Sequence, residues 1–556
     1  GMTEESFLAS GNYVNYNTIP LTDIHLHSNR GSEMSPNGDI KNIYILSFIG
    51  LFLLILASVN FMNLSTAHSL KRAKEVGIRK TLGSSKIELI KQFLTESGLI
   101  SFISLVLALI IATIAIPFFN DLSGKAISIP FLNPFFWLIL LLSVIVLGIF
   151  SGMYPAFFMS RFSPIKVLKG SNKGGTNDIN IRNALVVFQF AISAFLIVST
   201  LVVFQQLKFI QNKSLGYAKD HVLIIEDMHA AGDKAQIFKQ EIQQLGQVEN
   251  ATLTGYLPTP SYRSDSSFFE EGTRNQEDAV QMQNWIVDYD YVKTLDLKII
   301  AGRNFDKKFA TDSLAMIINE AAVKIMGITP DEAIGKRMKS DFKNEAAQFS
   351  TIVGVVKDFH FESLRNSIEG LSLSIGKPNG MLAVKINSGD LTNTVSHIES
   401  IWKKIVPGQP FNYSFMEESF NTTYQVERRL GSIFTVFTLL SILIACLGLF
   451  GLAAFNAEKR SKEIGIRKVL GASVSQITYK LSVDFLKLVG IAIVISLPLA
   501  WYAMNKWLED FEYRIEIGLG VFVLATVLAI TISIVTVSYQ GIKAAIANPI
   551  KSLRTE

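Results

Sequence analysis

Few residues of this sequence have the types and the spacing that metal binding or catalysis needs. Asp23, His25 and His27 alternate along the chain, and three alternate side chains on one face of a β-strand could bind a metal ion. We favour a solvated strand edge for this triplet. We interpret the Asp358-Phe-His360 triplet as a strand end, because it has no cysteine partner and no clear cluster of ligands. The chain is therefore predicted to have no metal site.

A nucleotide site is not predicted either. A phosphate-binding loop of the Gly-x-x-x-x-Gly-Lys-Ser/Thr type surrounds phosphates with backbone N–H groups, and it needs glycines at a fixed spacing. The segments that begin at Gly124 and Gly170 lack that spacing. The one cysteine, Cys446, lies in an apolar run, so a disulfide framework and a cysteine-based metal site are excluded. We expect no catalytic residue and no cofactor in this chain, and any ATP hydrolysis has to come from another chain.

The composition predicts a membrane protein. Of the 556 residues 49% are hydrophobic and only 18% are charged, whereas a soluble protein has about a quarter charged residues. The apolar residues gather in seven runs of about 20 residues, the length that a helix needs to cross a hydrocarbon core of ~30 Å. The net charge of +5 is too small to predict binding to nucleic acid. The predicted spans are 43–66, 94–118, 134–157, 183–206, 431–456, 483–506 and 517–540.

The distribution of lysine and arginine predicts the orientation in the membrane. Basic residues concentrate in the segments 67–91, 158–182 and 457–481, and the remaining short loops between spans are poor in them. Since basic loops stay on the cytoplasmic side, these three segments and the C-terminus are expected inside. Residues 1–42 and 207–430 are then expected outside.

The chain contains an internal repeat around two of the basic segments. The thirteen residues from Lys71 to Gly83 align without gaps on those from Lys459 to Gly471, and ten of the thirteen are identical. A second match follows the last span of each half, where Pro-Ile-Lys occurs at 164–166 and again at 549–551. The pattern indicates two copies of one unit, each ending in three spans, with a basic segment between the first two.

The two copies differ at their beginnings. The second copy has an additional span, 183–206, followed by the long outer segment 207–430, whereas the first copy shows only residues 1–42 before its spans. Either this asymmetry is genuine, or the chain begins inside its first outer domain. We favour the second explanation, because an isolated edge of a domain would be poorly ordered. A full-length protein would then have eight spans in two four-span repeats.

Each repeated segment is predicted to form a short helix, a sharp turn and a long helix. Gly83 and Gly471 stand where the C-terminus of a helix favours a residue in the left-handed conformation. Ser85 and Ser473 follow, each with Glu or Gln three residues later, which is the capping-box pattern that begins a helix. We therefore expect the second helix of each segment to continue into the membrane.

The short helix has a composition that suits docking onto a partner protein. Val76, Ile78 and Leu82 are apolar residues in a stretch otherwise rich in charge, and an apolar strip with a basic rim fits a groove. Alternatively, the lysines and arginines only anchor the topology and bind anionic lipid head groups. That alternative does not explain why the same residues recur in the same order in two copies, so we favour a contact function.

The repeated Lys-Glu-(Val/Ile)-Gly-Ile-Arg-Lys-x-Leu-Gly motif resembles the signature of FtsX-like/MacB-like ABC-transporter permeases. The outer segment is similar to the same family at 301–305, 318–322, 334–336 and 352–359. In that family the repeated segment is the coupling helix, which sits in a cleft of a separate ATPase subunit. The resemblance implies these ATPase-contact residues: Glu75, Gly77, Arg79, Lys80, Gly83, Glu463, Gly465, Arg467, Lys468 and Gly471.

The resemblance also implies a domain plan and a bacterial cytoplasmic membrane as the location. The expected fold is a polytopic α-helical membrane protein with an extracytoplasmic mixed α/β domain and two tandem four-span repeats. The first span and most of one outer domain of the family are absent from this sequence. The expected segments are 1–42, the end of a truncated outer domain; 43–157, a transmembrane half with coupling segment 67–93; 158–182, a linker; 183–206, the span opening the second repeat; 207–430, a MacB-like periplasmic core domain; 431–540, a transmembrane half with coupling segment 457–482; and 541–556, a cytoplasmic tail.

Four residues inside the spans are predicted to pack helices together. Asn60 and Asn63 lie one helical turn apart, and their counterparts in the second copy are Gly448 and Gly451. Small and polar residues on one face are what helix packing in lipid uses. A substrate path through the membrane would also need polar residues, but the spans otherwise carry almost no ionisable groups. We therefore favour packing.

The outer segment 207–430 is predicted to be a mixed α/β domain with a rigid connection to the membrane. Residues 200–213 and 417–430 continue their spans outward without a break, as helices of a stalk would, although a polar helix could also be a passive spacer. The predicted strands are 221–226, 316–318, 351–356 and 382–386, and the predicted helices are 232–246, 319–326 and 391–406.

These expectations together predict the membrane subunit of a bacterial ABC system. Closure of a partner ATPase dimer, with ATP and Mg bound to that dimer, would bring the coupling helices together and move the outer domain. The family allows export of antimicrobial compounds, peptides, lipids or lipoproteins, and a periplasmic adaptor is a possible further partner. The alternative is an FtsX-like regulator that activates a cell-wall hydrolase and transports nothing. A sensor is disfavoured, because the chain has no kinase-like or DNA-binding segment.

Overall fold

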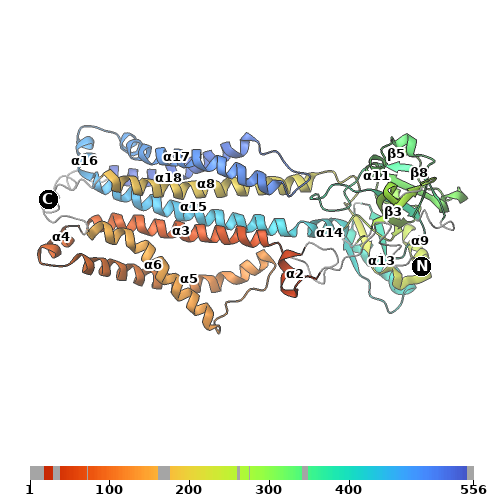
Figure 1. Cartoon of the computed structure of the whole chain (residues 1–556), viewed down its shortest axis with the longest axis horizontal. Helices are drawn as coiled ribbons and strands as arrows, with labels where there is room; N and C mark the ends of the chain where they lie inside the picture. Colours follow the sequence, from red (N-terminus) through yellow and green to blue (C-terminus); the bar gives the residue numbers. More distant parts are fainter. Residues whose placement is uncertain are drawn as a thin grey trace.

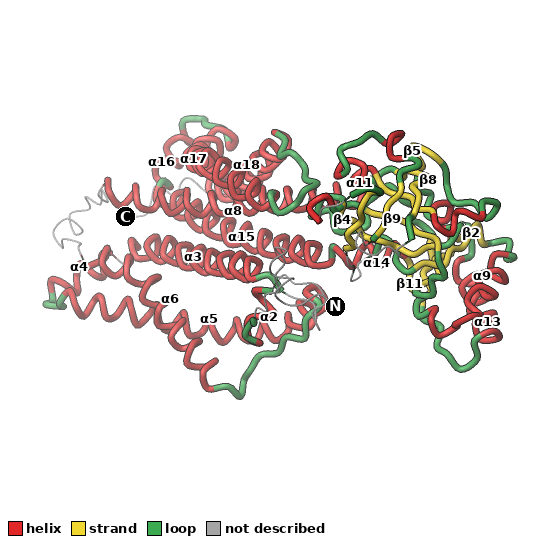
Figure 2. Tube along the Cα trace, turned by 45° about the vertical axis from the view of Figure 1, so that its right-hand side comes forward, coloured by secondary structure: helices red, strands yellow, loops and turns green. Residues whose placement is uncertain are grey.

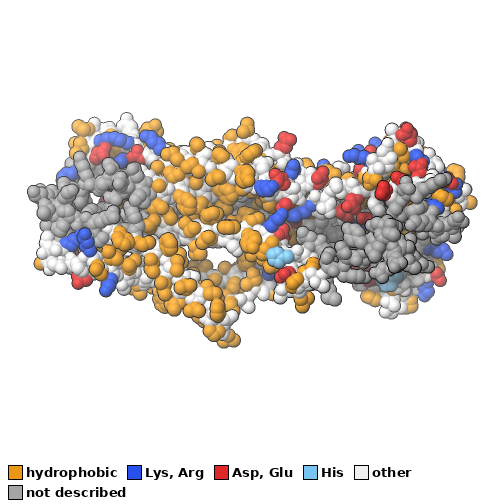
Figure 3. Space-filling model, viewed as in Figure 1, with side chains coloured by type: hydrophobic (Ala, Val, Ile, Leu, Met, Phe, Trp, Pro, Cys, Tyr) orange, Lys and Arg blue, Asp and Glu red, His pale blue; other side chains and the backbone are white. Residues whose placement is uncertain are grey.

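The computed structural model describes residues 18–28, 38–71, 73–160, 176–259, 263, 265–273, 276–340, 348–387 and 389–546. A bundle of long helices forms one end of the elongated molecule, and an α/β domain forms the other (Figure 1). The cytoplasmic, membrane and outer parts expected from the sequence follow one another along the long axis. Apolar side chains cover the bundle as a broad belt, and charged side chains lie beyond both edges of this belt (Figure 3).

The seven predicted spans are confirmed as helices. Seven helices in the described ranges are long and apolar enough to cross a membrane. Six of the predicted spans each lie within one of them, whereas the span 517–540 begins two residues before its helix. Several continue for two or more turns beyond the predicted bounds. They are α3 (Ile40–Lys71), α5 (Lys86–Ser123), α6 (Pro134–Ser160), α8 (Thr176–Asn212), α15 (Gln425–Lys459), α17 (Val474–Leu508) and α18 (Leu519–Ile546).

Helices α8 and α15 form the centre of the bundle. Helix α15 packs against α3, α8 and α18, whereas α8 packs most extensively against α17. Helices α5 and α6 pair with each other and reach the rest of the bundle mainly through the contact of α6 with α3. Two hydroxyl pairs join α8 to α15, Ser193 to Ser441 at 2.9 Å and Thr200 to Thr438 at 2.8 Å. Polar contacts therefore fix how these two helices lie against each other.

The stalk prediction is confirmed on one side and wrong on the other. Helix α8 continues without interruption to Asn212, so residues 200–213 extend the span toward the α/β domain as expected. Residues 417–430 are not one continuous helix. Helix α14 (Met416–Thr423) ends before α15 begins, and Tyr424 between them has φ −110° and ψ 18°. No proline or glycine marks this break, because it depends on tertiary contacts of Tyr424 that the sequence pattern does not show.

The strand interpretation of Asp23, His25 and His27 is wrong. These residues lie on helix α2 (Leu21–His27), where alternate side chains do not share one face. In the described ranges no group of three or more His, Cys, Asp or Glu side chains is arranged to hold a metal ion. Asp358 and His360 follow the end of strand β8 (Ser350–Val356), as the sequence predicts.

The α/β domain consists of one sheet with two parts. Strands β4, β3, β7, β8, β6 and β9 pair in this order, and β9 pairs in parallel with β4, which closes a barrel. Strands β11, β1, β10 and β2 continue the sheet beyond β4, and helices α9 and α13 pack against this part (Figure 2). The strands are β1 (Val222–Ile225), β2 (Val248–Thr254), β3 (Asp265–Glu270), β4 (Val280–Val287), β5 (Ile299–Gly302), β6 (Ala315–Asn319), β7 (Arg337–Lys339), β8, β9 (Leu371–Ile375), β10 (Met381–Ile386) and β11 (Tyr413–Phe415).

The four predicted strands match β1, β6, β8 and β10, and two predicted helices match α11 (Glu320–Ile325) and α13 (Leu391–Ile405). The predicted helix 232–246 is wrong at both ends. It is only nine residues long, as α9 (Ala235–Gln243), and follows a 3-10 turn in which Gly232 has φ 52°. The other short helices are α10 (Tyr291–Thr294) and α12 (Pro330–Ala333).

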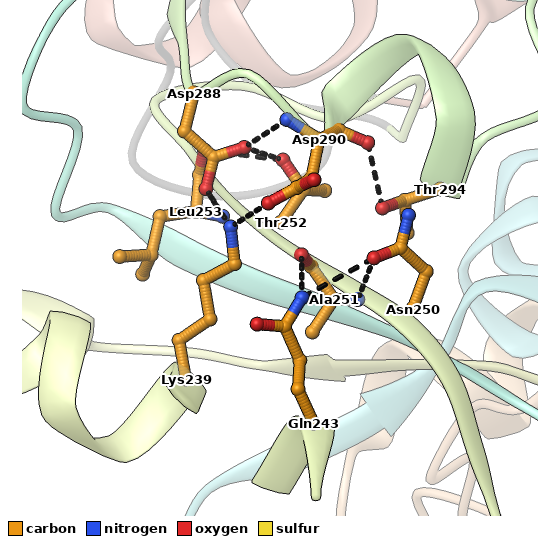
Figure 4. A network of polar contacts seen from close by, with 9 residues as sticks. All are labelled: Lys239, Gln243, Asn250, Ala251, Thr252, Leu253, Asp288, Asp290 and Thr294. Atoms are coloured by element: carbon orange, nitrogen blue, oxygen red, sulfur yellow. Dashed lines mark hydrogen bonds and ion pairs between the residues drawn. The ribbon is translucent and has the colours of Figure 1, made fainter. Parts of the chain in front are cut away.

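A buried ion-pair network connects α9 to the end of β4 (Figure 4). The Lys239 ammonium lies 2.6 Å from a carboxylate oxygen of Asp288 and 2.5 Å from one of Asp290, and its side chain is 3% exposed. Asp288 also accepts hydrogen bonds from the Thr252 hydroxyl at 2.5 Å and from the Leu253 N–H at 2.8 Å. Each buried charge therefore has an opposite charge or a hydrogen-bond donor beside it.

We predict that Lys239→Met destabilises the α/β domain by about 3 kcal/mol, because it leaves two carboxylates beside a buried apolar side chain. The measurement is equilibrium unfolding of the full chain in urea, followed by tryptophan fluorescence. The exposed Lys293→Met is the matched control and should leave the free energy of unfolding unchanged. A loss for Lys239→Met no larger than that of the control would show that the network does not stabilise the domain.

Candidate functional site

The two repeated segments form two tips at the same end of the bundle, opposite the α/β domain (Figure 1). The first tip is helix α4 (Ala73–Thr81) and the turn that follows it, and the second tip is helix α16 (Ser461–Val469) and its turn. The repeat predicted a short helix before each glycine turn, and both helices are present. In each half the tip lies between the first long helix and the second.

The turn after each short helix has the same hydrogen bonds. In the first tip the N–H of Ser84 donates to the carbonyl of Arg79 at 3.0 Å, and the N–H of Gly83 donates to that of Lys80 at 3.2 Å. This pair of bonds is a Schellman motif, and it needs the positive φ of 101° that Gly83 adopts. The second tip repeats it with Ala472 donating to Arg467 at 2.9 Å, Gly471 donating to Lys468 at 3.1 Å, and φ 91° at Gly471.

Both predicted capping boxes are present. The Ser85 side chain accepts a hydrogen bond from the N–H of Glu88, and the Glu88 carboxylate accepts one from the N–H of Ser85, at 3.2 and 3.0 Å. Ser473 and Gln476 make the same two contacts at 3.3 and 3.0 Å. The two membrane helices α5 and α17 therefore begin directly after the turns, so each tip is a rigid extension of a span.

One apolar residue anchors each tip to the bundle. Val76 is 4% exposed and packs in a cluster with Leu89 and Phe93 of α5 and with Ala156 of α6. The prediction of an exposed strip that includes Val76 is therefore wrong at this position. Its counterpart Ile464 is also buried, in a cluster whose other members are Ala457, Ile477, Leu481 and Ala545.

The apolar residues at the end of each tip are exposed. Leu82 is 82% exposed and Leu470 is 80% exposed, although both are leucines at the end of a helix. Ile78, Ile466 and Val469 are also exposed. Exposed leucines at equivalent positions of two tips, outside the apolar belt, are typical of a surface that binds a partner.

The charged residues of the tips pair along each helix. Arg79 lies 2.7 Å from Glu75, and its guanidinium also donates to Gln92 of α5 at 3.1 Å. The pair repeats as Arg467 and Glu463 at 2.7 Å, with all four side chains about half exposed. Such exposed pairs stabilise a helix by only about 0.3–0.5 kcal/mol, so their guanidinium groups stay accessible to a partner.

The remaining predicted contact residues lie in the same two tips. Burial, and after it the nearby Lys86 ammonium, lower the pKa of Lys80. Gly465 is buried, so it faces the bundle and not the exposed end. Gly77 and Lys468 lie within α4 and α16 respectively. The structure thus brings the ten predicted residues together as two equivalent groups of five.

The four predicted packing residues lie where α3 meets the second half. A Cβ atom added at Gly448 of α15 would lie 2.6 Å from the Asn60 side-chain oxygen, and one added at Gly451 would lie 2.0 Å from Leu64. Asn63 is 2% exposed. Within the described part of the chain, the Asn60 oxygen and the Asn63 amide nitrogen have no hydrogen-bond partner.

The sequence interpretation missed Gln189 of α8, which reaches the same place. Its amide donates to the carbonyl of Ile444 at 3.1 Å, and its nitrogen lies 3.0 Å from a Cβ added at Gly448. A glutamine inside an apolar span was the signal that could have identified it. Glycine at 448 thus leaves room for two amide side chains between three helices.

The C-terminal model of the FtsX-like permease family matches the chain twice, at residues 47–164 and 435–549. Each match covers the three membrane helices of one half together with its tip. Both membrane halves of the chain are therefore similar to FtsX-like permeases. Its seven long apolar helices, in the described ranges, indicate a membrane protein.

The individual relatives of the chain are export proteins, and their names describe them as both ATP-binding proteins and permeases. The macrolide export ATP-binding/permease protein MacB of Campylobacter jejuni is 31% identical over 120 residues, which are 22% of this chain and 18% of that protein. A probable export ATP-binding/permease protein of Pseudomonas fluorescens is 21% identical over 261 residues, 44% of this chain and 39% of that protein. The permease therefore aligns with less than half the length of each relative.

Among solved structures, the periplasmic region of MacB from Actinobacillus actinomycetemcomitans is similar to part of the permease. The match has 13% sequence identity and a TM-score of 0.27, and it covers 37% of this chain and 92% of that structure.

We predict that Gly448→Ala destabilises the bundle by about 1–3 kcal/mol, because the added methyl group overlaps the Asn60 and Gln189 amides. The measurement is thermal unfolding of the purified permease in detergent. Gly490→Ala is the matched control, since it lies inside α17 and a Cβ added there meets no atom within 4 Å. Equal unfolding temperatures for the two variants would contradict a tight contact between α3, α8 and α15.

Proposed function

We propose that the permease is the membrane subunit of an ABC transporter and that its two tips are coupling helices that bind a separate ATPase. The observation that carries this proposal is the duplicated end of each tip, where an exposed leucine follows an Arg-Lys pair. An ATPase dimer offers two equivalent surfaces, so two equivalent tips on one chain match its symmetry. The tips and the C-terminus then lie in the cytoplasm, as the basic loops predict.

The bundle is suited to transmit movement. Each tip continues into a membrane helix through a capped turn, and α8 leaves the membrane as an unbroken helix toward the α/β domain. Closure of the ATPase would bring the tips together and tilt the helices, and this movement would reach the extracytoplasmic domain. The partner ATPase would bind ATP and Mg, because this chain has no predicted site for either.

The proposed work takes place outside the membrane. The polar side chains within the spans are mostly uncharged amides and hydroxyls that lie in helix contacts. This supports a bundle that transmits movement, and it disfavours a path for a hydrophilic solute through the membrane. The relatives are named for export, and the cargo we propose is an antimicrobial compound, a peptide or a lipidated molecule presented on the outer side. An adaptor on that side would complete the export path.

The test is an affinity purification of the full-length protein from native membranes in mild detergent. We predict that Leu82→Asp combined with Leu470→Asp reduces the recovery of a P-loop ATPase at least about tenfold, because each change places a charge in a desolvated contact. Both side chains are about four-fifths exposed, so folding should not change.

Leu132→Asp is the matched control, since it places the same charge on a fully exposed leucine of the loop between α5 and α6, at the opposite end of the bundle. It should recover as much ATPase as the wild type. Recovery of a cell-wall hydrolase without any ATPase, or equal ATPase recovery with all three proteins, would contradict the proposal.

A further inference from the structure

The loop between α17 and α18 binds the α/β domain through its backbone. The N–H of Glu512 donates to the carbonyl of Arg365 at 3.2 Å, and the N–H of Tyr513 donates to that of Leu364 at 3.3 Å. Residues 364 and 365 belong to the segment between β8 and β9 of the domain. Two backbone hydrogen bonds thus join the loop after α17 to the domain.

The same loop is bound to α8. The side chain of Gln206 is fully buried, and its amide donates to the carbonyl of Tyr513 at 2.9 Å while its oxygen accepts from the N–H of Ile515 at 3.0 Å. A buried amide whose two ends are both satisfied holds the loop in one register.

Two aromatic side chains of the loop complete the contact. The Tyr513 ring meets the His360 ring edge to face, with 4.5 Å between the centroids, and the Lys213 ammonium lies 4.7 Å from the Tyr513 centroid. Burial, together with the charge of Lys213, lowers the pKa of His360 to about 4, so the imidazole is neutral at physiological pH. His360 therefore acts here as an aromatic partner.

The second aromatic side chain of the loop, Phe511, packs against the guanidinium of Arg365. The guanidinium is 4.7 Å from the Phe511 centroid and 2.7 Å from the buried Glu427 carboxylate of α15. The neighbouring Leu364 N–H donates to the Tyr424 hydroxyl at 2.8 Å, and Tyr424 lies between the end of α14 and the start of α15. The loop, the domain, α8 and α14 therefore meet in one apolar cluster, which includes Ile210, Leu215, Leu364, Phe420, Tyr424 and Phe511.

The corresponding loop of the first half is arranged differently. Its described hydrogen bonds run within its own hairpin, from the Asn120 amide to Ile127 at 2.9 Å and from the Trp137 indole to Phe131 at 2.8 Å. The repeat alone therefore does not account for the contact that residues 511–515 make with the domain. Among the described residues, the loop of the first half makes no hydrogen bond to the domain.

We infer that residues 511–515 form a clasp through which α17 moves the α/β domain. The inference rests on the proposed function, because the movement starts at the second tip. Ile464 of α16 packs against Ile477 and Leu481 of α17, and the 35 residues of α17 then span about 50 Å to the clasp. Displacement of the tip is carried along α17 to the domain, in addition to any movement of α8 and α15.

The experiment uses the full-length permease with its co-purified ATPase in lipid nanodiscs. Spin labels are attached to Lys377→Cys in the α/β domain and to Leu132→Cys in the outer loop of the first half, both exposed, in a Cys446→Ser background. The ATP-induced change in the distance between the labels is measured by pulsed EPR. In the wild type we expect a shift between the nucleotide-free and the ATP-bound states.

Tyr513→Ala and Arg365→Ala each remove one side of the clasp. We expect both to recover ATPase as the wild type does and to lose more than half of the distance shift. Tyr513→Phe keeps the ring and should retain the shift. Lys41→Ala is the matched control, because Lys41 contacts Asp510 of the same loop at 3.2 Å but lies on α3, outside the domain.

The outcomes separate the two claims. Normal ATPase recovery with a full distance shift in both clasp variants would overturn the inference and leave the proposed function standing, with α8 and α15 as the transmitting helices. A wild type that recovers no ATPase would overturn the proposed function and the clasp with it. If Tyr513→Ala does not fold, Arg365→Ala alone tests the inference. A lost distance shift in Arg365→Ala would support the inference, and a full shift would overturn it.

Discussion

A hydrocarbon surrounding offers no hydrogen-bond partner to a peptide group, and this constraint determines most of the structure. The spans are unbroken helices, and the few polar side chains inside them meet at helix contacts, as Ser193 does with Ser441 and Gln189 with Ile444. Away from Pro117 of α5 and Pro498 of α17, helices of this kind cannot bend freely inside the membrane. A force applied to one end therefore reaches the other end as a tilt or a shift of the whole helix.

The ends of the helices are where such movement can be received and delivered. At one end the two tips present exposed leucines on rigid, capped turns that are equivalent in the two halves. At the other end, α8, α14 and the loop after α17 meet the α/β domain in one apolar cluster. The two equivalent tips and the contacts with the domain thus lie at opposite ends of the bundle (Figure 1). In the proposed function an ATPase dimer acts on both tips, and the domain follows the helices that reach it.

The membrane part was predictable because its rules are local. Apolar length gives the spans, and the Gly83 turn with the Ser85 capping box depends only on nearby residues, so the tip was predicted correctly in both copies. Val76 was assigned to the exposed strip, because its partners Phe93 and Ala156 come from other helices. The break at Tyr424 and most strands of the barrel were missed for the same reason. They depend on pairings between residues far apart in the sequence, such as β4 with β9.

The central claim is that an ATPase brings the two tips together. The most direct measurement is the distance between spin labels on Leu82→Cys and Leu470→Cys in a Cys446→Ser background, for the permease with its ATPase in nanodiscs. The account predicts that the distance shortens when a non-hydrolysable ATP analogue is added and returns when the nucleotide is removed. A distance that stays the same with ATPase and nucleotide bound would contradict it.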